Sequence, residues 1–317
     1  MAQQRGVNAL CLLGFESAYK TSPTDGFTMK LNTSSLSSKR AKNVPSTLSG
    51  TRNPVEPFDG NTDVGGNLVV PADSLSFWYW LKAAFGAPTT TGSVSPWTHE
   101  FKIGSSQPSF GIEFQYTDLA TAKYDLFTGN KISSIGMEIG GDGELIANLG
   151  VIGAVEAMGA ASFDSSPANP GFYRLGNFQA ALTEGGSPLG NATSFSFNID
   201  FGLDPQRVIG GGGVLGAIPE AIVKVTGNLK TLFEDTTLLA KALNSTETAL
   251  KLTITRSVSA ILEWEIQELQ YEQKSPEIPG PGGLLVDLNF AGYYTDGSEA
   301  SAIVARLTST AEHSGGV

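Results

Sequence analysis

Residues able to carry out catalysis are few in this chain of 317 residues, and they lie far apart. The only two histidines are His99 and His313. A Ser/His/Asp set or a zinc site needs partners at suitable spacing, which the sequence around these histidines does not offer. The glycine run 210–213 lacks the Gly-Lys-Ser/Thr ending of a phosphate-binding loop. We therefore expect no catalytic residue, no metal and no other cofactor, and the chain is predicted not to be an enzyme.

The remaining reactive or charged groups favour structural roles. Glu263, Glu265 and Glu268 lie in a predicted strand, 260–271, where they form its polar side. Cys11 is the only cysteine, so no internal disulfide can form, and it is expected to fill apolar space. The formal net charge of −11 argues against a nucleic-acid grip, which needs lysine and arginine to neutralise phosphates.

A motif that occurs twice indicates how the chain is organised. Val-Gly-Gly-Asn-Leu at 64–68 precedes a predicted helix, and Val-Thr-Gly-Asn-Leu at 225–229 precedes another. The two motifs are separated by the distance in sequence from Gly66 to Gly227. We call this separation, from a residue of the first copy to its counterpart in the second, the first offset. Upstream of the two motifs, residues 27–32 and residues 195–200 both alternate as half-buried strands do, so we expect these two segments to correspond.

The repetition continues downstream with a shorter spacing. Residues 143–151 resemble residues 282–290, and the separation from Leu145 to Leu284, which relates them, is called the second offset. A Pro/Thr/Gly/Ser-rich insertion at 87–108, which the second copy lacks, accounts for the shorter second offset. The order of the repeated segments is kept, so the sequence predicts an internal duplication.

The two predicted helices have matching apolar positions. The first helix signal covers 73–86, from Asp73 as the N-cap to Gly86 as the residue just after the helix. The second helix spans 234–244. An apolar side on each should cover a sheet, and the residues expected in this helix–sheet core are Leu75, Phe77, Trp78, Leu81, Leu238 and Leu239.

Composition favours a mainly β fold. The 38 glycines, 16 prolines and short alternating runs argue for β-sandwich or barrel units. We expect two tandem domains, each with one flanking α-helix and long loops: residues 1–160, a linker at 161–176, and residues 177–317. Only 16% of residues are charged, below the roughly 25% usual for soluble domains. Either other subunits cover much of the surface, or it is neutral and rich in Ser, Thr and Asn.

A long polar segment, 33–63, is predicted to be a loop that becomes ordered against a partner. Loops beyond about 12–15 residues in a compact domain are usually functional or disordered. Basic and apolar residues in this segment are the expected contacts between subunits or rings: Lys39, Arg40, Lys42, Val44, Leu48 and Arg52. The sequence contains no secretion signal and no apolar run long enough for a membrane helix, so we expect synthesis in a host cytoplasm and no membrane insertion.

In order along the first copy, six segments resemble the major tail-tube proteins of long-tailed bacteriophages with flexible tails. These are Phe15–Thr21, the loop segments Val44–Ser46 and Gly50–Arg52, the 64–68 motif, the helix 74–85 and the closing strand 143–153. The resemblance covers nearly all of the first copy, and the second copy follows it more loosely.

This resemblance implies a β-sandwich whose inner sheet closes with its neighbours into a ring around a lumen. Stacked rings would form the virion's tail tube, which first houses the tape-measure protein and then passes DNA without binding it specifically. Tail terminator and baseplate or distal tail proteins would contact its ends. Single-domain relatives close with six copies, so a duplicated chain should form a trimeric ring with pseudo-sixfold symmetry. An acidic lumen is expected to repel phosphate, with Asp125, Glu263 and Glu265 as candidates.

The alternative is a carbohydrate- or receptor-binding β-sandwich of a virion or cell surface. Such a protein would expose clustered aromatic residues on loops. Trp78, Trp80 and Trp264 fall in a predicted helix or strand, which leaves only Trp97 for that role.

Overall fold

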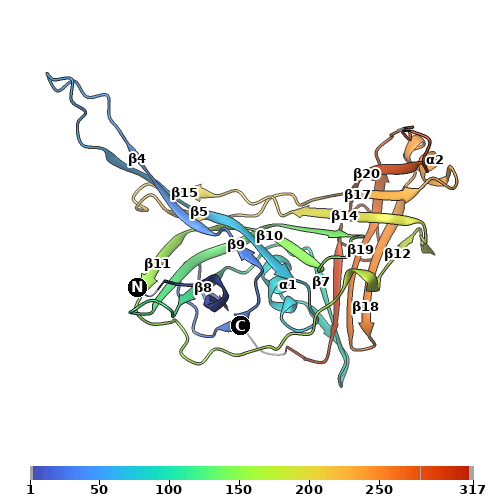
Figure 1. Cartoon of the computed structure of the whole chain (residues 1–317), viewed down its shortest axis with the longest axis horizontal. Helices are drawn as coiled ribbons and strands as arrows, with labels where there is room; N and C mark the ends of the chain where they lie inside the picture. The colour runs from blue at the N-terminus through green and yellow to red at the C-terminus, as the bar shows by residue number, and fades with distance from the viewer. Residues whose placement is uncertain (1–2, 279, 314–317) are drawn as a thin grey trace.

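The computed structural model describes residues 3–278 and 280–313, and the fold is mainly β (Figure 1). Two α-helices are present in these residues, α1 (Phe77–Phe85) and α2 (Thr237–Leu243), with short 3₁₀ turns at Gly6–Asn8 and Asn177–Gln179. The strands up to residue 160 are β1 (Leu10–Phe15), β2 (Phe27–Met29), β3 (Thr33–Ser34), β4 (Ser37–Asn43), β5 (Phe58–Pro71), β6 (Thr89–Thr91), β7 (Trp97–Lys102), β8 (Phe110–Tyr116), β9 (Lys123–Ile139), β10 (Ile146–Gly153) and β11 (Val155–Gly159). The later strands are β12 (Ala180–Glu184), β13 (Ser187–Pro188), β14 (Ala192–Asp200), β15 (Gln206–Arg207), β16 (Leu215–Ala217), β17 (Lys224–Leu232), β18 (Thr248–Ser257), β19 (Ala260–Tyr271), β20 (Leu285–Tyr293) and β21 (Val304–Ser309).

One antiparallel sheet runs through both halves of the chain. Its order is β4–β5–β10–β9–β14–β17–β20–β19, with β3 pairing with β5 beside β4, and we call it the long sheet. The ladder between β9 and β14 joins the first half of the chain to the second. The long sheet therefore continues across the expected domain boundary at 161–176.

A second layer of strands lies against the long sheet. In the first half it consists of β2, β1, β8, the start of β9 and β11, and in the second half of β13, β12, β18, β19 and β21. The insertion 87–108 forms the β6–β7 hairpin, and β7 pairs with β21. This insertion from the first half thus extends the second layer of the second half.

Helix α1 is buried on every side, which differs from the one-sided helix expected. All nine of its residues are buried, including Lys82, whose ammonium lies 4.4 Å from the ring centroid of Phe15. The helix begins later than predicted, after Ser76. Asp73 instead closes the preceding turn, because its carboxylate accepts hydrogen bonds from the N–H groups of Leu75 and Ser76, both at 2.6 Å. Leu75, which was expected in the helix–sheet core, is half-buried. Among the described residues, no helix is long and apolar enough to span a membrane.

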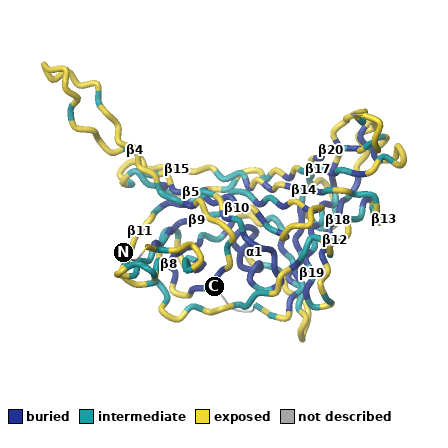
Figure 2. The backbone as a smooth tube through the Cα atoms, viewed as in Figure 1, coloured by how far each residue is buried: buried dark blue, intermediate teal, exposed yellow. Residues whose placement is uncertain are grey.

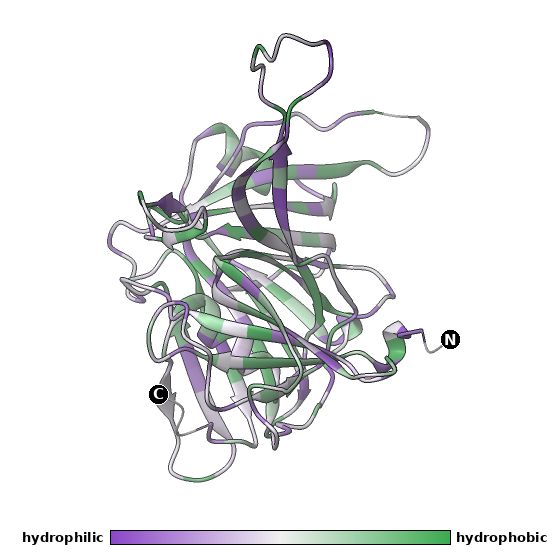
Figure 3. Ribbon diagram, turned by 90° about the vertical axis from the view of Figure 1, so that its left-hand side faces the viewer, coloured by the Kyte–Doolittle hydropathy of each residue, from purple (hydrophilic) through white to green (hydrophobic). Residues whose placement is uncertain are grey.

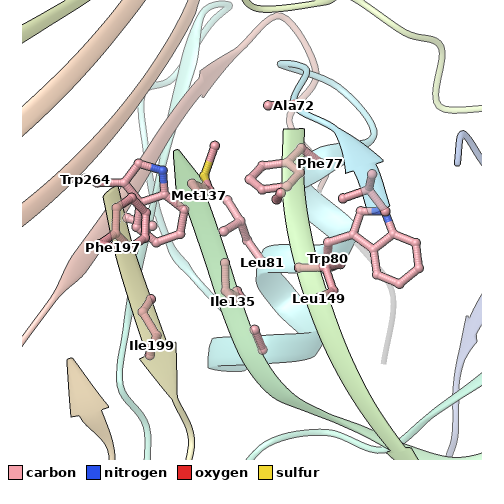
Figure 4. Close-up of a cluster of buried hydrophobic side chains, with 14 of the residues drawn as sticks. Ala72, Phe77, Trp80, Leu81, Ile135, Met137, Leu149, Phe197, Ile199 and Trp264 are labelled. Carbon is pink, nitrogen blue, oxygen red and sulfur yellow. The ribbon is translucent and has the colours of Figure 1, made fainter. Parts of the chain in front are cut away.

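The hydrophobic core is continuous between the two halves (Figure 4). Phe85 of α1 packs edge-on against Phe201 with ring centroids 5.3 Å apart, and Phe197 lies 4.9 Å from Trp264. Phe77, Trp78 and Leu81 are in this core, as expected. In α2, Leu238 is buried whereas Leu239 is half-buried, so the second helix covers its sheet less completely than the first.

Equivalent ladders in the two halves have the same register. Leu68 on β5 pairs with Ser34 and with Leu149, and Leu229 on β17 pairs with Phe195 and with Leu288. The first offset relates Ser34 to Phe195, and the second offset relates Leu149 to Leu288. One expectation is corrected: β2 pairs with β1, so residues from Ser34 onward, rather than 27–32, take the position that β14 has in the second half.

Candidate functional site

The long sheet exposes a polar face, which is built by the alternation of side chains along its strands. Along each strand every second side chain points into the core, for example Leu68, Leu149 and Phe197. The side chains between them point away from the core and are mostly amides and hydroxyls. We call these residues the polar face: Ser35, Ser37, Asn67, Ser134, Asn148, Ser196, Asn198, Thr226, Asn228 and Asn289.

Amide side chains on the polar face are hydrogen-bonded to one another across strands. Asn228 Nδ2 donates to Asn289 Oδ1 at 3.0 Å, and Asn289 Nδ2 donates to Glu272 Oε2 at 2.9 Å. Charged side chains beside them carry both signs. Asp287, for example, lies 4.0 Å from Lys230 Nζ and 3.5 Å from Lys274 Nζ. The face is therefore polar with little net charge.

None of the three predicted lumen carboxylates lies on this face. Glu263 and Glu265 project from the part of β19 that pairs with β18 and β21. Glu263 forms an ion pair with Lys251 at 2.9 Å, and Glu265 is bonded to Arg306. Asp125 is buried, on the part of β9 that pairs with β8. Burial, followed by the neighbouring Glu156 carboxylate, raises the pKa of Asp125 to about 6.

The predicted long loop is instead a β-hairpin that projects far from the body of the molecule, and we call residues 39–63 the arm (Figures 1 and 2). Its strands belong to β4 and β5, and only residues 44–57 form an irregular tip. Val44 is 67% exposed and Leu48 is 99% exposed. Lys39, Arg40, Lys42 and Arg52 are exposed as well. Apolar side chains this exposed at a projecting tip indicate a contact surface.

Cross-strand pairs reduce the basic character expected for the arm. Asp59 lies opposite Lys42 and is bonded to it, and Arg40 Nη1 lies 3.7 Å from the same carboxylate. The arm also contains Glu56 and Asp63. Its four basic residues are thus nearly balanced by three acidic ones, which the sequence interpretation did not weigh.

The glycine run 210–213 holds the base of the arm. The N–H of Thr62 donates to Gly213 O at 2.9 Å, and Arg40 Nη2 donates to Gly212 O at 3.4 Å. Arg207, from β15, donates to Thr62 O at 3.1 Å and pairs with Asp63. The second half of the chain therefore fixes the direction of the arm, a role that the glycine run by itself did not indicate.

The two histidines, distant in sequence, meet beside α1. Their ring centroids are 5.3 Å apart, and His313 stacks on Trp78 at 4.8 Å. His99 Nδ1 is bonded to Thr90 Oγ1 at 2.8 Å, and His99 Nε2 to Ala311 O at 3.0 Å. Burial lowers the pKa of His99, which favours the neutral ring. His99 thus ties the insertion to the C-terminal segment, and the described residues contain no group of three or more metal-ligating side chains.

Taken together, the continuous polar sheet and the projecting arm define a mainly β protein with a long exposed sheet surface and an exposed hairpin. The family model for phage tail tube proteins matches residues 6–292. The chain therefore belongs to the phage tail tube protein family, whose members are structural components of the virion tail. A search of curated proteins gave no match.

Proposed function

We propose that three chains close into a ring with pseudo-sixfold symmetry, and that stacked rings form the tail tube. The observation that carries this proposal is the equal register of the two halves of the long sheet. The unit β4–β5–β10–β9 corresponds to β14–β17–β20–β19, and the β9–β14 ladder already joins one unit to the next. Three chains supply six units. Closure would pair sheet edges that are otherwise open to uncontrolled association.

The same correspondence supports an internal duplication, with residues 1–160 and 177–317 as the two tube units. Residues 161–176 connect the units while lying on the first one, because the N–H of Leu175 donates to Ala72 O at 3.0 Å and that of Ser74 to Tyr173 O at 3.0 Å. The contact between Phe85 and Trp264 in the shared core supports the two units acting as one building block.

The polar face is the proposed lining of the bore. Its amides and hydroxyls are neutral, and the lysines beside them, such as Lys230 and Lys274, lie near the carboxylate of Asp287. Passing phosphates would therefore meet few free cations, so DNA would adhere little during ejection. The same surface would enclose the tape-measure protein during assembly. The three carboxylates predicted as an acidic lining lie elsewhere, so the proposed lining relies on few net charges rather than on repulsion.

The arm is the proposed contact with the neighbouring subunit or ring. The arm is long, it exposes Val44 and Leu48, and its charges are paired. These features suit a contact that is held by apolar packing and whose register is set by ion pairs. Rings at the tube ends would present the same surfaces to tail terminator and distal tail proteins.

Electron microscopy without imposed symmetry, combined with native mass measurement of rings, tests the proposal. We expect three chains per ring, six similar sandwiches in projection and arms repeated three times. Six chains per ring, or a protein that stays monomeric under all conditions, would contradict it.

The lining is tested separately with virions that carry Asn148→Lys and Asn198→Lys. Tubes should form normally, and DNA release should slow because added lysines bind passing phosphates. Val258→Lys, in the turn between β18 and β19, is the matched control and should release DNA at the normal rate. Equal rates in both variants would remove the polar face from the bore.

A further inference from the structure

We infer that neighbouring chains join through one antiparallel ladder, residues 34–38 of one chain against 273–277 of the next. In this ladder Ser38 lies opposite Gln273, Leu36 opposite Ser275, and Ser34 opposite Glu277. The inference rests on the proposed function, because it names the contact that would close the ring. Its occupant is a second copy of this chain.

The template is the ladder that joins the two halves within one chain. There Met137 of β9 pairs with Phe197 of β14, flanked by matching pairs on both sides. The first offset, which relates Gly227 to Gly66, also relates Phe197 of β14 to Leu36.

The other partner follows from the β19–β20 ladder. In the first half, Gly150 lies opposite Ser134. In the second half, the residue that corresponds to Gly150 is Asn289, and its backbone carbonyl accepts a hydrogen bond from the N–H of Glu272 at 2.8 Å. Ser134 therefore corresponds to Glu272, and Met137, at the third position after Ser134, corresponds to Ser275. The register between chains follows from these pairings without further adjustment.

Backbone directions on the two edges agree with this register. The N–H of Ser35 donates to Asn67 O at 2.8 Å, so Ser35 faces β5, and in a ladder its neighbours Ser34 and Leu36 face outward. Glu272 faces β20 by its bond to Asn289, so by the same alternation Gln273, Ser275 and Glu277 face outward. Every outward residue on one edge thus meets an outward residue on the other.

Proline at 276 fits this ladder. Proline has no N–H, so it is tolerated in a strand only where that donor is not needed. By alternation Pro276 belongs to the set that faces β20 rather than the neighbouring chain. It therefore removes no hydrogen bond from the proposed contact.

Side chains at the contact between chains differ from those at the template. The template ladder brings together Ile135, Met137, Ile139, Phe195, Phe197 and Ile199, all of them buried. At the contact between chains Leu36 is the one large apolar residue, and the others are Ser, Gln and Glu. Moreover, the N–H of Leu36, one of the donors on this sheet edge, already donates to Ser34 Oγ at 3.2 Å within the chain. Contacts around the ring should therefore alternate between a permanent apolar one and a weaker polar one, which keeps free chains from associating through this edge.

Cysteine pairs provide the test. Ser37 and Lys274 would be a non-hydrogen-bonded pair, with Cα atoms about 4.5 Å apart, within reach of a disulfide. Oxidised tubes of the variant S37C/K274C should yield covalent products that end at three chains in denaturing gels without reductant. Cys11 is kept, because it is buried and burial raises the pKa of its thiol. Each single variant, S37C and K274C, should remain monomeric in the gel.

The matched control is K39C/K274C, in which the first cysteine is displaced by two residues, about 7 Å along the strand. It should cross-link at least tenfold less. Tubes in which S37C/K274C does not cross-link, or cross-links no better than the control, overturn the ladder and leave the ring proposal standing. Products longer than three chains would mean that the contact joins rings, and also overturn it.

Hydrogen exchange on the unmodified chain gives an independent readout if the cysteine variants fail to assemble. The amides of Gln273 and Ser275 should exchange at least tenfold more slowly in tubes than in free chains. Unchanged exchange in tubes contradicts the ladder. If the unmodified chain forms no rings at all, the proposed function fails, and the ladder fails with it.

Discussion

Gly66 and Gly227 occupy the same position in the two halves of the molecule and are required there for the same reason. A Cβ on Gly66 would lie 2.4 Å from the carbonyl oxygen of Ser35, and one on Gly227 would lie 2.3 Å from that of Ser196. The two serines are themselves related by the first offset. The shared glycine of the repeated motif therefore marks a close approach between adjacent strands of the long sheet.

Replacing either glycine by alanine should destabilise the fold. We expect Gly66→Ala and Gly227→Ala each to lower the free energy of unfolding by about 1–3 kcal/mol, because the added methyl group meets backbone that must shift. Urea unfolding followed by circular dichroism measures the change. Gly143→Ala is the control, since its Cβ would have no atom within 4 Å. A loss as large for Gly143→Ala would show that the close approach is not the cause.

Shortening the arm should prevent stacking without affecting the fold. Joining Asn43 to Phe58 with an Asn-Gly turn removes the tip and keeps the β4–β5 pairs that end at these residues. Thermal unfolding should be unchanged, whereas electron micrographs should contain separate rings or free chains. The double variant Val44→Ser/Leu48→Ser keeps the length of the tip and should shorten the tubes. Tubes of normal length from the shortened arm would rule out its role in stacking.

Arg306 should be one of the most sensitive surface positions. It bonds Glu265 of β19, Glu100 of β7 at 2.8 Å and Glu299 at 2.5 Å, and so ties the insertion to the second half. Arg306→Met leaves three carboxylates close together without their shared cation. We expect a loss of about 1–3 kcal/mol in unfolding free energy at pH 7, between the values typical of exposed and buried pairs. Arg52→Met at the arm tip is the control and should be neutral.

The same variant should change the response to acid. Burial raises the pKa of Glu100, but hydrogen bonds from Lys102 and Arg306 outweigh this and hold that pKa below its usual value. Such a carboxylate stabilises the fold above its unfolded-state pKa, and the stabilisation is lost as pH falls through the folded-state pKa. Wild type should therefore lose more stability than Arg306→Met between pH 6 and pH 3. Parallel losses in both proteins would contradict this.

Asp125 should have the opposite effect on acid stability. Its folded-state pKa of about 6 lies above the usual value, so the folded chain holds this proton more tightly than the unfolded chain. Protonation as pH falls from 7 toward 4 should stabilise the fold. Asp125→Asn should raise the unfolding free energy at pH 7.5 by about 1–3 kcal/mol, and the difference should vanish below pH 4. Asp142→Asn in the exposed turn after β9 should have no such effect.

Several features of this protein could be predicted from residue patterns alone. Period-two alternation predicted β8, β18 and β19 close to their observed bounds, because one side of each strand must be buried. The repeated motif predicted the paired positions of Gly66 and Gly227, and the apolar residues of α1 predicted that this helix is in the core. Local alternation is encoded residue by residue, as the hydropathy colouring of the strands illustrates (Figure 3).

Only the tertiary structure decided which surface each charged residue occupies. Alternation assigns Glu263 to a polar side, but not to a particular sheet, and the partner Lys251 depends on how β18 and β19 pair. Likewise, residues 39–63 mix turn-forming with strand-forming residues, so they resembled a loop until the pairing of Lys42 with Asp59 defined a hairpin. The contact between Gly213 and Thr62 joins segments from opposite halves of the chain, a separation over which local sequence carries no information. Long-range pairing, rather than local propensity, therefore determined the polar face, the direction of the arm and the edges available to a neighbouring chain.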